Sequence, residues 1–417
     1  MRRHLVFLES NLTGSGYEAI AAAHRAGHRV TFLTQDMSIY VAPGHEKLDQ
    51  AWIDEMVVCD SNDPRAVVAA VRELAQPVDA LIAVGEWHMI CAAEASRELR
   101  LPGPAPDGVR AARDKSETRR LCNAAGVPVP RFIRVTDPAD VRGQALTFPC
   151  IVKPLDDAGS NGVRLCASVE EAADHVRAVL EDTHNERGQR KIPAALIEEY
   201  VDGPEVSVEM LVHEGCSTTL AVTWKELGAL PHFIETGHHV PAELGAGLDE
   251  QCVRTAAQAL RAVGFDFGAA HVELRLAADG PRLIEINCRP AGDRITQLVK
   301  LSTGVSISAE LVAMHLPPWS PPQPDRGSAA AIAFLPSTSG IVTSVSGTHE
   351  ARRIPGVVDV SLYVEPGYCS DPQLNNTARH GHAITIAPTG KEALAHARAA
   401  VACLRVDTSD QVTAGAH

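Results

Sequence analysis

The chain has 417 residues, enough for two or three domains, and its apolar content is sufficient for buried cores. Its net charge of −14, from 38 basic and 52 acidic residues, argues against nucleic acid and anionic membranes as partners. The ten cysteines are scattered singly, as is typical of small buried side chains in a reducing cytoplasm. Apolar runs stay shorter than a signal-peptide core or a membrane span, so we expect a cytoplasmic protein.

The N-terminal part alternates between short apolar strands and helices. Strands are expected at residues 4–8, 28–33, 56–59 and 80–84, with helices ending near residues 27 and 74. This order predicts a doubly wound α/β domain at residues 1–108. The turn after the first strand, with Gly14, Gly16 and Ala19, nearly matches a dinucleotide-binding fingerprint. The stronger evidence for a nucleotide lies further along the chain.

The middle and the end of the chain mix strands and helices. Helices are expected at residues 109–126, from 169, at 249–264 and near 305–315, and strands at 150–154, 195–201 and onward to about 234. Residues 317–327 are proline-rich and indicate a linker. Beyond it we expect short strands at 330–334, 357–364 and 383–386 and a closing helix at 391–404.

Two stretches alternate between apolar and polar residues, as strands with one buried face do: residues 271–275 and 283–290. An Ala-Asp-Gly-Pro turn signal joins them, so we expect a hairpin. Folded in this way, Glu273 and Glu285 lie roughly opposite each other, which is unfavourable unless a cation lies between them. With Asn287 they form a ligand set suited to Mg²⁺, and Arg289 brings a fork shaped for phosphate oxygens. A solvated strand pair with ordinary charged outer positions is the alternative.

A small glycine-rich loop, residues 159–162, lies between two expected strands. Its backbone N–H groups could face phosphate oxygens, although most such loops merely connect strands, and no Walker A lysine follows. Lys153 ends the strand before this loop, and Lys115 opens a helix earlier in the chain. Both lysines are candidate phosphate contacts, with a solvated surface position as the alternative for each.

Residues 198–201 end a strand, and Glu205 lies where the next strand begins. Backbone groups at such a break can contact an adenine edge, and Glu205 could accept hydrogen bonds from ribose hydroxyls. Without the other motifs the segment would be only a turn.

His238 and His239 place two imidazoles next to each other. Adjacent residues on an extended chain point to opposite sides, which disfavours a zinc pair. We expect one imidazole near phosphate and a structural role for the other, without assigning which.

In this order the residues resemble the ATP-grasp superfamily, over residues 4–405. The Gly237-His238-x-x-Pro241 pattern and the C-terminal part are similar to the L-amino acid ligase branch of the carboxylate–amine ligases. The resemblance implies an α/β and α+β protein: the N-terminal doubly wound α/β domain, a central ATP-grasp domain and a C-terminal β-rich domain. The central domain would span 109–316, with a lid at about 127–201, and the last domain 328–410.

The resemblance also implies residue roles. ATP would contact Lys115, Lys153, Gly159, Ser160, Asn161, Gly162, Glu198, Glu199, Tyr200, Val201 and Glu205. Mg²⁺, usually two ions with Mn²⁺ as an alternative, would bind Glu273, Glu285 and Asn287. The catalytic residues would be Arg289, Lys153 and His238, with Arg289 stabilising charge on the transferring phosphoryl group.

The chain departs from the pattern just after Arg289. Pro290 to Arg294 replace the continuation of a biotin carboxylase, and Asp293 stands where many amino acid ligases have a second glycine. Asp293 and Arg294 are therefore candidate substrate contacts. Glu86, at the end of an expected strand, is a candidate contact for a substrate amino group, with a surface helix cap as the alternative.

The resemblance implies an ATP-dependent carboxylate–amine ligase. A small carboxylate would be converted to an acyl phosphate with release of ADP, and an amine would then displace phosphate, in dipeptide or natural-product biosynthesis. The alternatives are another ATP-grasp reaction, such as a biotin-carboxylase-like carboxylation or a purine-biosynthesis-type ligation. A homodimer is a further expectation from the relatives.

Overall fold

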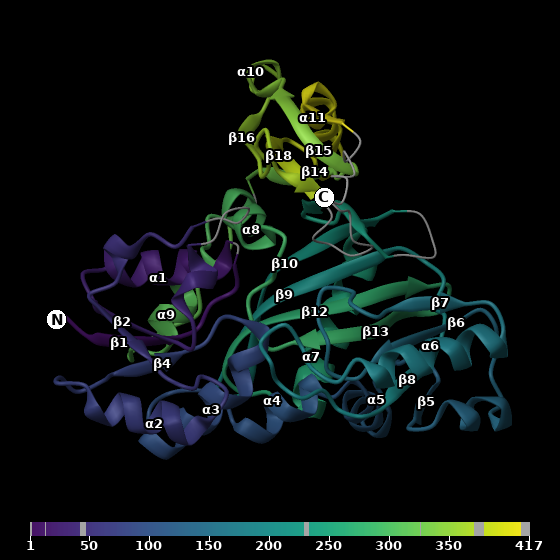
Figure 1. Cartoon of the computed structure of the whole chain (residues 1–417), viewed down its shortest axis with the longest axis horizontal. Helices are drawn as coiled ribbons and strands as arrows, with labels where there is room; N and C mark the ends of the chain where they lie inside the picture. The colour runs from purple at the N-terminus through teal and green to yellow at the C-terminus, as the bar shows by residue number, and fades with distance from the viewer. Residues whose placement is uncertain are drawn as a thin grey trace, which may run out of the picture.

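The computed structural model describes residues 2–12, 14–41, 47–228, 233–325, 327–370 and 379–409. The described residues form an N-terminal parallel sheet, a lid, a large antiparallel sheet and a small C-terminal layer (Figure 1). The fold class predicted from the sequence is confirmed. The predicted outer domain limits at residues 1 and 410 lie outside the described residues.

The N-terminal domain is built on a parallel sheet whose described strands lie in the order β3-β2-β1-β4. Every residue of β1 is buried, which is typical of a parallel strand with both faces covered. The elements are β1 (His4–Leu8), α1 (Ser15–Arg25), β2 (Arg29–Thr34), η1 (Met37–Tyr40), η2 (Gln50–Trp52), β3 (Glu55–Val58), α2 (Pro64–Glu73), β4 (Ala80–Ile82), η3 (Glu86–His88) and α3 (Met89–Leu99). Because η3 follows β4, Glu86 lies at the carboxyl edge of the sheet, where ligands bind in open parallel sheets.

The prediction of one helix at 109–126 is wrong, because the structure has two: α4 (Pro106–Arg113) and α5 (Lys115–Ala124). Asp114 between them has an extended backbone, with φ −84° and ψ 101°, and its carboxylate caps the first turn of α5. A capping aspartate begins a new helix. The break places Lys115 at the first position of α5, where it faces the central sheet rather than solvent.

Residues 132–199, within the segment predicted as a lid and called the lid below, form a smaller α/β unit. Its strands lie in the order β5-β8-β6-β7, all antiparallel. Its elements are β5 (Phe132–Val135), η4 (Pro138–Gly143), β6 (Cys150–Pro154), β7 (Arg164–Cys166), α6 (Val169–Glu181) and β8 (Ala195–Glu199). A separate hydrophobic core lies between this sheet and α6. The glycine-rich loop connects β6 to β7, at the end of the lid strands.

The lid contacts the N-terminal domain through the loop between α6 and β8. Arg187 donates a hydrogen bond from Nη2 to the backbone oxygen of Ser10 at 3.1 Å, and its guanidinium lies 5.6 Å from the Tyr40 ring centre. Gln189 donates from Nε2 to Oδ1 of Asn62 at 2.7 Å. The lid is therefore tied to the carboxyl edge of the N-terminal sheet as well as to the central domain.

The central sheet has eight described strands in the order β13-β12-β9-β10-β11-β14-β18-β16. The strands of its ATP-grasp part are β9 (Glu205–His213), β10 (Cys216–Leu227), β11 (Glu235–Val240), β12 (Gly268–Ala277) and β13 (Gly280–Asn287). The helices packed with it are α7 (Ala246–Val263), α8 (Ile295–Thr303) and α9 (Ile307–Met314). The sequence patterns did not indicate α8, which begins just after the hairpin.

The C-terminal part adds three strands to this sheet, and its other described strands form a separate sheet in the order β17-β15-β19. Beyond the proline-rich segment, β14 pairs with β11, and β18 and β16 extend the same sheet. The C-terminal elements are β14 (Ala329–Pro336), β15 (Gly340–Ser346), α10 (Thr348–Ala351), β16 (Val357–Leu362), β17 (Cys369–Ser370), β18 (Arg379–Ala387), α11 (Gly390–Cys403) and β19 (Arg405–Ser409). Figure 1 shows this part at one end of the central sheet. As a result, a side chain of β18 can reach the centre of the molecule.

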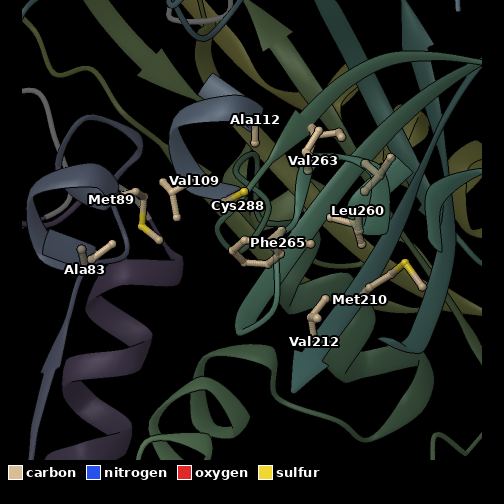
Figure 2. Packing of buried hydrophobic residues seen from close by; sticks show 14 of the residues in the cluster. Ala83, Met89, Val109, Ala112, Met210, Val212, Leu260, Val263, Phe265 and Cys288 are labelled. Atoms are coloured by element: carbon tan, nitrogen blue, oxygen red, sulfur yellow. The ribbon is translucent and has the colours of Figure 1, made fainter. Parts of the chain in front are cut away.

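One buried cluster joins the N-terminal domain to the central sheet. It contains Met89 from α3, Val109 from α4, Phe265 and Cys288, all of them buried (Figure 2). Interiors packed at crystal-like density hold neighbouring elements in one relative position. This cluster therefore fixes the end of the hairpin against α3 and α4.

Candidate active site

The predicted hairpin is present. β12 and β13 pair antiparallel, with Glu273 opposite Glu285 and His271 opposite Asn287. The turn lies at Ala278 and Asp279, and the chain re-enters the sheet at Gly280. The two carboxylates therefore lie opposite each other, as the alternation in the sequence indicated.

A cavity lies between the lid and the central sheet, with the hairpin on its wall. Most residues singled out from the sequence line it: Lys115, Lys153, Gly159, Ser160, Asn161, Glu198, Glu199, Tyr200, Val201, Glu205, Glu273, Glu285, Asn287, Arg289 and Asp293. In the described part of the chain, four others are not among its lining residues: Gly162, Glu86, His238 and Arg294. The structure thus brings the lysines, the glycine loop and the carboxylates to one place.

The two predicted lysines are buried and paired rather than solvated. Lys115 lies 3.0 Å from Glu285 and donates a hydrogen bond to the backbone oxygen of Asp157 at 2.7 Å. Lys153 lies 2.6 Å from Glu198, whose other oxygen accepts from Nε of Arg119 at 2.6 Å. Burial would raise the pKa of Glu198, but Arg119 and Lys153 hold it below its ordinary value. Two buried cations therefore line the cavity, and their contact with phosphates stays a prediction.

The segment predicted to contact adenine is also held by arginines. Arg275 donates from Nη1 to the backbone oxygen of Val201 at 3.0 Å, and its guanidinium lies 5.4 Å from the ring centre of Tyr200. Nε of Arg275 lies 3.2 Å from Glu205, its register partner on β9. The roles of this segment and of Glu205 toward adenosine stay predictions.

Lys225 is the central residue that sequence reasoning missed. Its ammonium lies 2.9 Å from Glu205, 2.7 Å from Glu235 and 2.6 Å from Glu273. Burial would lower the pKa of Lys225, but these three carboxylates raise it well above the ordinary value. Oxygens of the same three carboxylates lie within 4.8 Å of one another, a spacing suited to a cation. The three carboxylates lie on β9, β11 and β12, and Lys225 lies on β10. The order of these strands in the sheet, which the sequence pattern does not give, brings them together.

His271 forms a second buried contact of Glu273. Its Nδ1 lies 3.0 Å from Glu209 and its Nε2 lies 3.0 Å from Glu273. Burial lowers the pKa of His271, but Glu209 and Glu273 raise it to about 10, so the imidazole is charged at neutral pH. The sequence pattern did not single out this histidine.

Arg289 is held by Glu86, which is far from it in the sequence and is itself paired with Arg113. Its Nε donates a hydrogen bond to Oε2 of Glu86, and Oε1 of Glu86 accepts from Nη1 of Arg113 at 2.6 Å. Arg289 also donates to the backbone oxygen of Pro290 at 3.0 Å and to Oδ1 of Asn287 at 3.4 Å. Burial alone would raise the pKa of Glu86, but Arg289 and Arg113 lower it to about 2.

The other predicted substrate residues lie at the C-terminal side of the cavity. Asp293 pairs with Arg379 of β18 at 2.9 Å, and Nε2 of His238 lies 3.4 Å from Asp293 and 3.3 Å from Glu235. Burial opposes ionisation of Asp293, but Arg379 holds its pKa well below the ordinary value. Arg294 begins α8 as its N-terminal cap residue. The C-terminal part thus contributes a cation behind the cavity wall.

The two adjacent histidines point to different partners, as expected on a strand. His238 faces Glu235 and Asp293, whereas His239 lies 2.9 Å from the backbone oxygen of Pro241 and stacks near Trp224. His238 is therefore the one on the side of the cavity. Burial would lower the pKa of His238, but hydrogen bonds to Asp293 and Glu235 raise it.

The glycine loop has an unusual backbone. Gly159, Ser160 and Gly162 have φ values of 65°, 63° and 67°. The left-handed region is open to glycine and costs other residues energy, so Ser160 stores strain. Such strain is found at ligand-binding loops, and here it lies on the wall of the cavity.

Three family matches cover most of the chain. Residues 146–297 match the ATP-grasp domain, residues 18–103 the ATP-grasp N-terminal domain, and residues 333–409 the L-amino acid ligase C-terminal domain 2. The chain belongs to the ATP-grasp superfamily. An ATP-grasp domain implies ATP binding, and the resemblance stated from the sequence is confirmed.

The chain is also similar to individual proteins. The chain is 29% identical over 398 residues to the uncharacterized protein y4rH of Sinorhizobium fredii, covering 94% of this chain and 80% of that protein. It is 30% identical over 298 residues to carnosine synthase 1 of Gallus gallus, covering 67% of this chain but only 32% of the synthase. The crystal structure of an L-amino acid ligase from Bacillus licheniformis superposes with a TM-score of 0.84 at 24% identity, covering 98% and 99% of the two chains. That last likeness shows a shared fold.

Within the described ranges, we find no helix that combines the length and the apolar character needed to cross a bilayer.

Proposed function

We propose that the protein is an ATP- and Mg²⁺-dependent carboxylate–amine ligase. A small carboxylate attacks the γ-phosphate of ATP, which gives an acyl phosphate and ADP, and an amine then attacks the acyl carbon and releases phosphate. The product is an amide, as in dipeptide or natural-product biosynthesis. The match to an L-amino acid ligase C-terminal domain and the likeness to a carnosine synthase support this choice within the superfamily.

The observation that carries the proposal is the meeting of opposite charges in one cavity. Lys115 and Lys153 line the cavity together with the glycine loop, and Glu273, Glu285 and Asn287 line it from the hairpin. Phosphoryl transfer requires neutralisation and positioning of phosphate charge more than covalent participation by the protein. The two lysines would neutralise the phosphates, and the hairpin carboxylates beside them would hold the metal ion, which meets that requirement.

The hairpin residues fit a magnesium site. Two carboxylates on opposed positions and an amide oxygen are hard ligands, and all three side chains line the same cavity. Glu273, Glu285 and Asn287 would hold Mg²⁺, which would neutralise phosphate charge. Lys115 and Lys225 lie on these same carboxylates, at 3.0 Å from Glu285 and 2.6 Å from Glu273, so positive charge already balances both.

Arg289 stabilises the negative charge of the phosphoryl group that is transferred to the carboxylate. It lines the cavity beside Asn287 and keeps a fork that suits phosphoryl or acyl phosphate oxygens. Lys153, on a strand of the lid, contacts the phosphates. His238 contacts Asp293 and Glu235 and contributes to catalysis through these two carboxylates. The strained glycine loop closes over the phosphates and excludes water, which would otherwise hydrolyse the acyl phosphate.

A screen of amino acid pairs tests the proposal. Full-length protein with Mg·ATP is assayed for phosphate release with single amino acids and with pairs, and products are identified by mass spectrometry. We expect release that requires two substrates and a product whose mass equals their sum less one water. Release that depends on bicarbonate or on a sugar phosphate would instead assign the alternative ATP-grasp reactions. A product without an amide bond would refute the proposal.

A further inference from the structure

We propose that Glu86 positions the guanidinium of Arg289 for phosphoryl transfer, with Arg113 as the second partner of the Glu86 carboxylate. The inference rests on the proposed function, which places Arg289 at the transferring group. The inference adds that a residue of the N-terminal domain sets the orientation of Arg289 toward the transferring phosphoryl group.

The contacts place Glu86 behind Arg289 rather than in front of it. One carboxylate oxygen accepts from Nε of Arg289, and the other accepts from Nη1 of Arg113 at 2.6 Å. The Glu86 side chain is 7% exposed. In the described part of the chain Arg289 is among the cavity-lining residues and Glu86 is not. With both oxygens engaged by arginines, Glu86 acts through Arg289 and not on a substrate amino group.

The hydrogen bonds of Arg289 leave part of its donor capacity free in the described structure. Arginine has five N–H groups in a fixed plane. Among the described residues, Nε is bonded to Glu86, Nη1 to the backbone oxygen of Pro290 and Nη2 to Oδ1 of Asn287. In that arrangement each Nη keeps one further N–H. The contact at Nε therefore fixes the plane of the guanidinium and leaves one N–H on each Nη for oxygens.

Arg113 keeps this contact from cancelling the charge of Arg289. A lone carboxylate would neutralise the guanidinium, but one carboxylate shared by two arginines leaves a net positive cluster. Arg113 also donates from Nη2 to the backbone oxygen of Asp156 at 2.5 Å, just before the glycine loop. The cluster of Glu86, Arg113 and Arg289 thus joins the N-terminal domain, the hairpin end and the segment just before the glycine loop.

The hydrophobic core beside these three charged residues holds Glu86 and Arg289 in fixed relative positions. Cys288, the neighbour of Arg289, lies in the same buried core as Met89, which follows η3, and Val109 on α4 (Figure 2). A displacement of about 1 Å at a reacting group can cost about a hundredfold in rate. Because Glu86 lies next to this core, its carboxylate is suited to keep the Arg289 guanidinium within about 1 Å of its working position.

Steady-state kinetics of Glu86→Ala and Glu86→Gln test the inference in the full-length protein. We expect kcat of Glu86→Ala to fall between about tenfold and a hundredfold, because Arg289 loses its orientation. KM for ATP should stay within about threefold of the wild-type value, since the nucleotide contacts remain. Glu86→Gln keeps an oxygen acceptor for Arg289 and should lose less activity. Glu94→Gln, which removes a carboxylate paired with Arg110 on the same domain, is the matched control and should retain wild-type kcat.

A double-mutant cycle distinguishes positioning from an independent role. In the background of Arg289→Ala, Glu86→Ala should change kcat by less than about twofold, because its only route of action is gone. An equal loss in both backgrounds would overturn the inference. A rise in KM for the amine substrate with unchanged kcat would overturn it too, because it would assign Glu86 to substrate contact.

A measurement without turnover keeps the two proposals separable. Urea unfolding of wild type, both single variants and the double variant gives the coupling between Glu86 and Arg289. We expect a coupling of at least about fivefold in the unfolding equilibrium constant. If the wild-type protein releases no phosphate with any amino acid pair, the proposed function fails while this coupling persists. An additive cycle would overturn the inference regardless of activity.

Discussion

Glu273 and Glu285 are register partners on β12 and β13, and each has its own lysine. Lys225 lies 2.6 Å from Glu273, and Lys115 lies 3.0 Å from Glu285. Opposed like charges destabilise a strand pair, so each carboxylate needs a cation. The two lysines come from different elements, β10 and α5, which ties the hairpin to both sides of the cavity.

Replacing one hairpin carboxylate should weaken metal binding. We expect Glu285→Gln to lower the affinity for Mg²⁺ in the presence of ATP by roughly tenfold or more, because a charged hard ligand is lost. The measurement is the Mg²⁺ dependence of the thermal unfolding temperature at saturating ATP. Glu250→Gln on α7, an exposed carboxylate that is not among the described lining residues of the cavity, is the control. Identical Mg²⁺ midpoints for both variants would contradict the assignment.

Arg289→Ala should separate binding from chemistry. We expect kcat to fall by about a hundredfold or more, since a charge aimed at the transition state is removed. The dissociation constant for ATP, measured by calorimetry, should change by less than about threefold. Arg254→Ala, whose guanidinium lies on the exposed side of α7, serves for comparison. Near-normal kcat in Arg289→Ala would refute its role.

His238 should make stability depend on pH. Its pKa in the folded protein is raised above 6.5 by Asp293 and Glu235, against the effect of burial, with Arg379 also facing this cluster. Its contribution is therefore fully present below pH 6.5 and is lost as the pH rises through the raised folded pKa.

Urea unfolding between pH 5.5 and 9, roughly spanning the histidine range, measures this dependence. The difference in unfolding free energy between wild type and His238→Gln should be largest at the acidic end and shrink toward the alkaline end. The exposed His349→Gln variant controls for the loss of a histidine. A difference that grows with pH would contradict the assigned sign.

Arg187→Ala should loosen the lid. Its guanidinium contacts the backbone oxygen of Ser10 and the ring of Tyr40 across the interface between the lid and the N-terminal domain. We expect faster hydrogen exchange in the loop between α6 and β8, because local opening no longer breaks these contacts. Arg177→Ala on the outer face of α6 should leave that exchange unchanged. Equal protection in both variants would show that Arg187 does not hold the loop.

The sequence predicted those features that depend on local pattern. Strand alternation placed Glu273 opposite Glu285, and the order of lysines, loop and carboxylates indicated the superfamily, which the family matches confirm. Local pattern also gave one wrong prediction, a single helix at residues 109–126. The sequence has helical character on both sides of Asp114, and only the N-cap role of Asp114 shows that two helices meet there.

Contacts between distant segments could not be predicted in this way. Arg289 and Glu86 are 203 positions apart, and Asp293 and Arg379 are 86 apart. Lys225 is an ordinary charged residue in its own strand, and its three carboxylate partners come together only through the order of β9, β10, β11 and β12. Such pairings follow from the topology, which short-range periodicity does not encode.

The most direct test of the account follows oxygen through the reaction. The carboxylate substrate found by the amino acid screen is labelled with ¹⁸O in its carboxyl group and turned over with Mg·ATP and the amine. An acyl phosphate intermediate transfers one labelled oxygen to the released phosphate for each amide formed, and mass spectrometry of the phosphate should show it. Unlabelled phosphate accompanying amide formation would contradict the proposed mechanism.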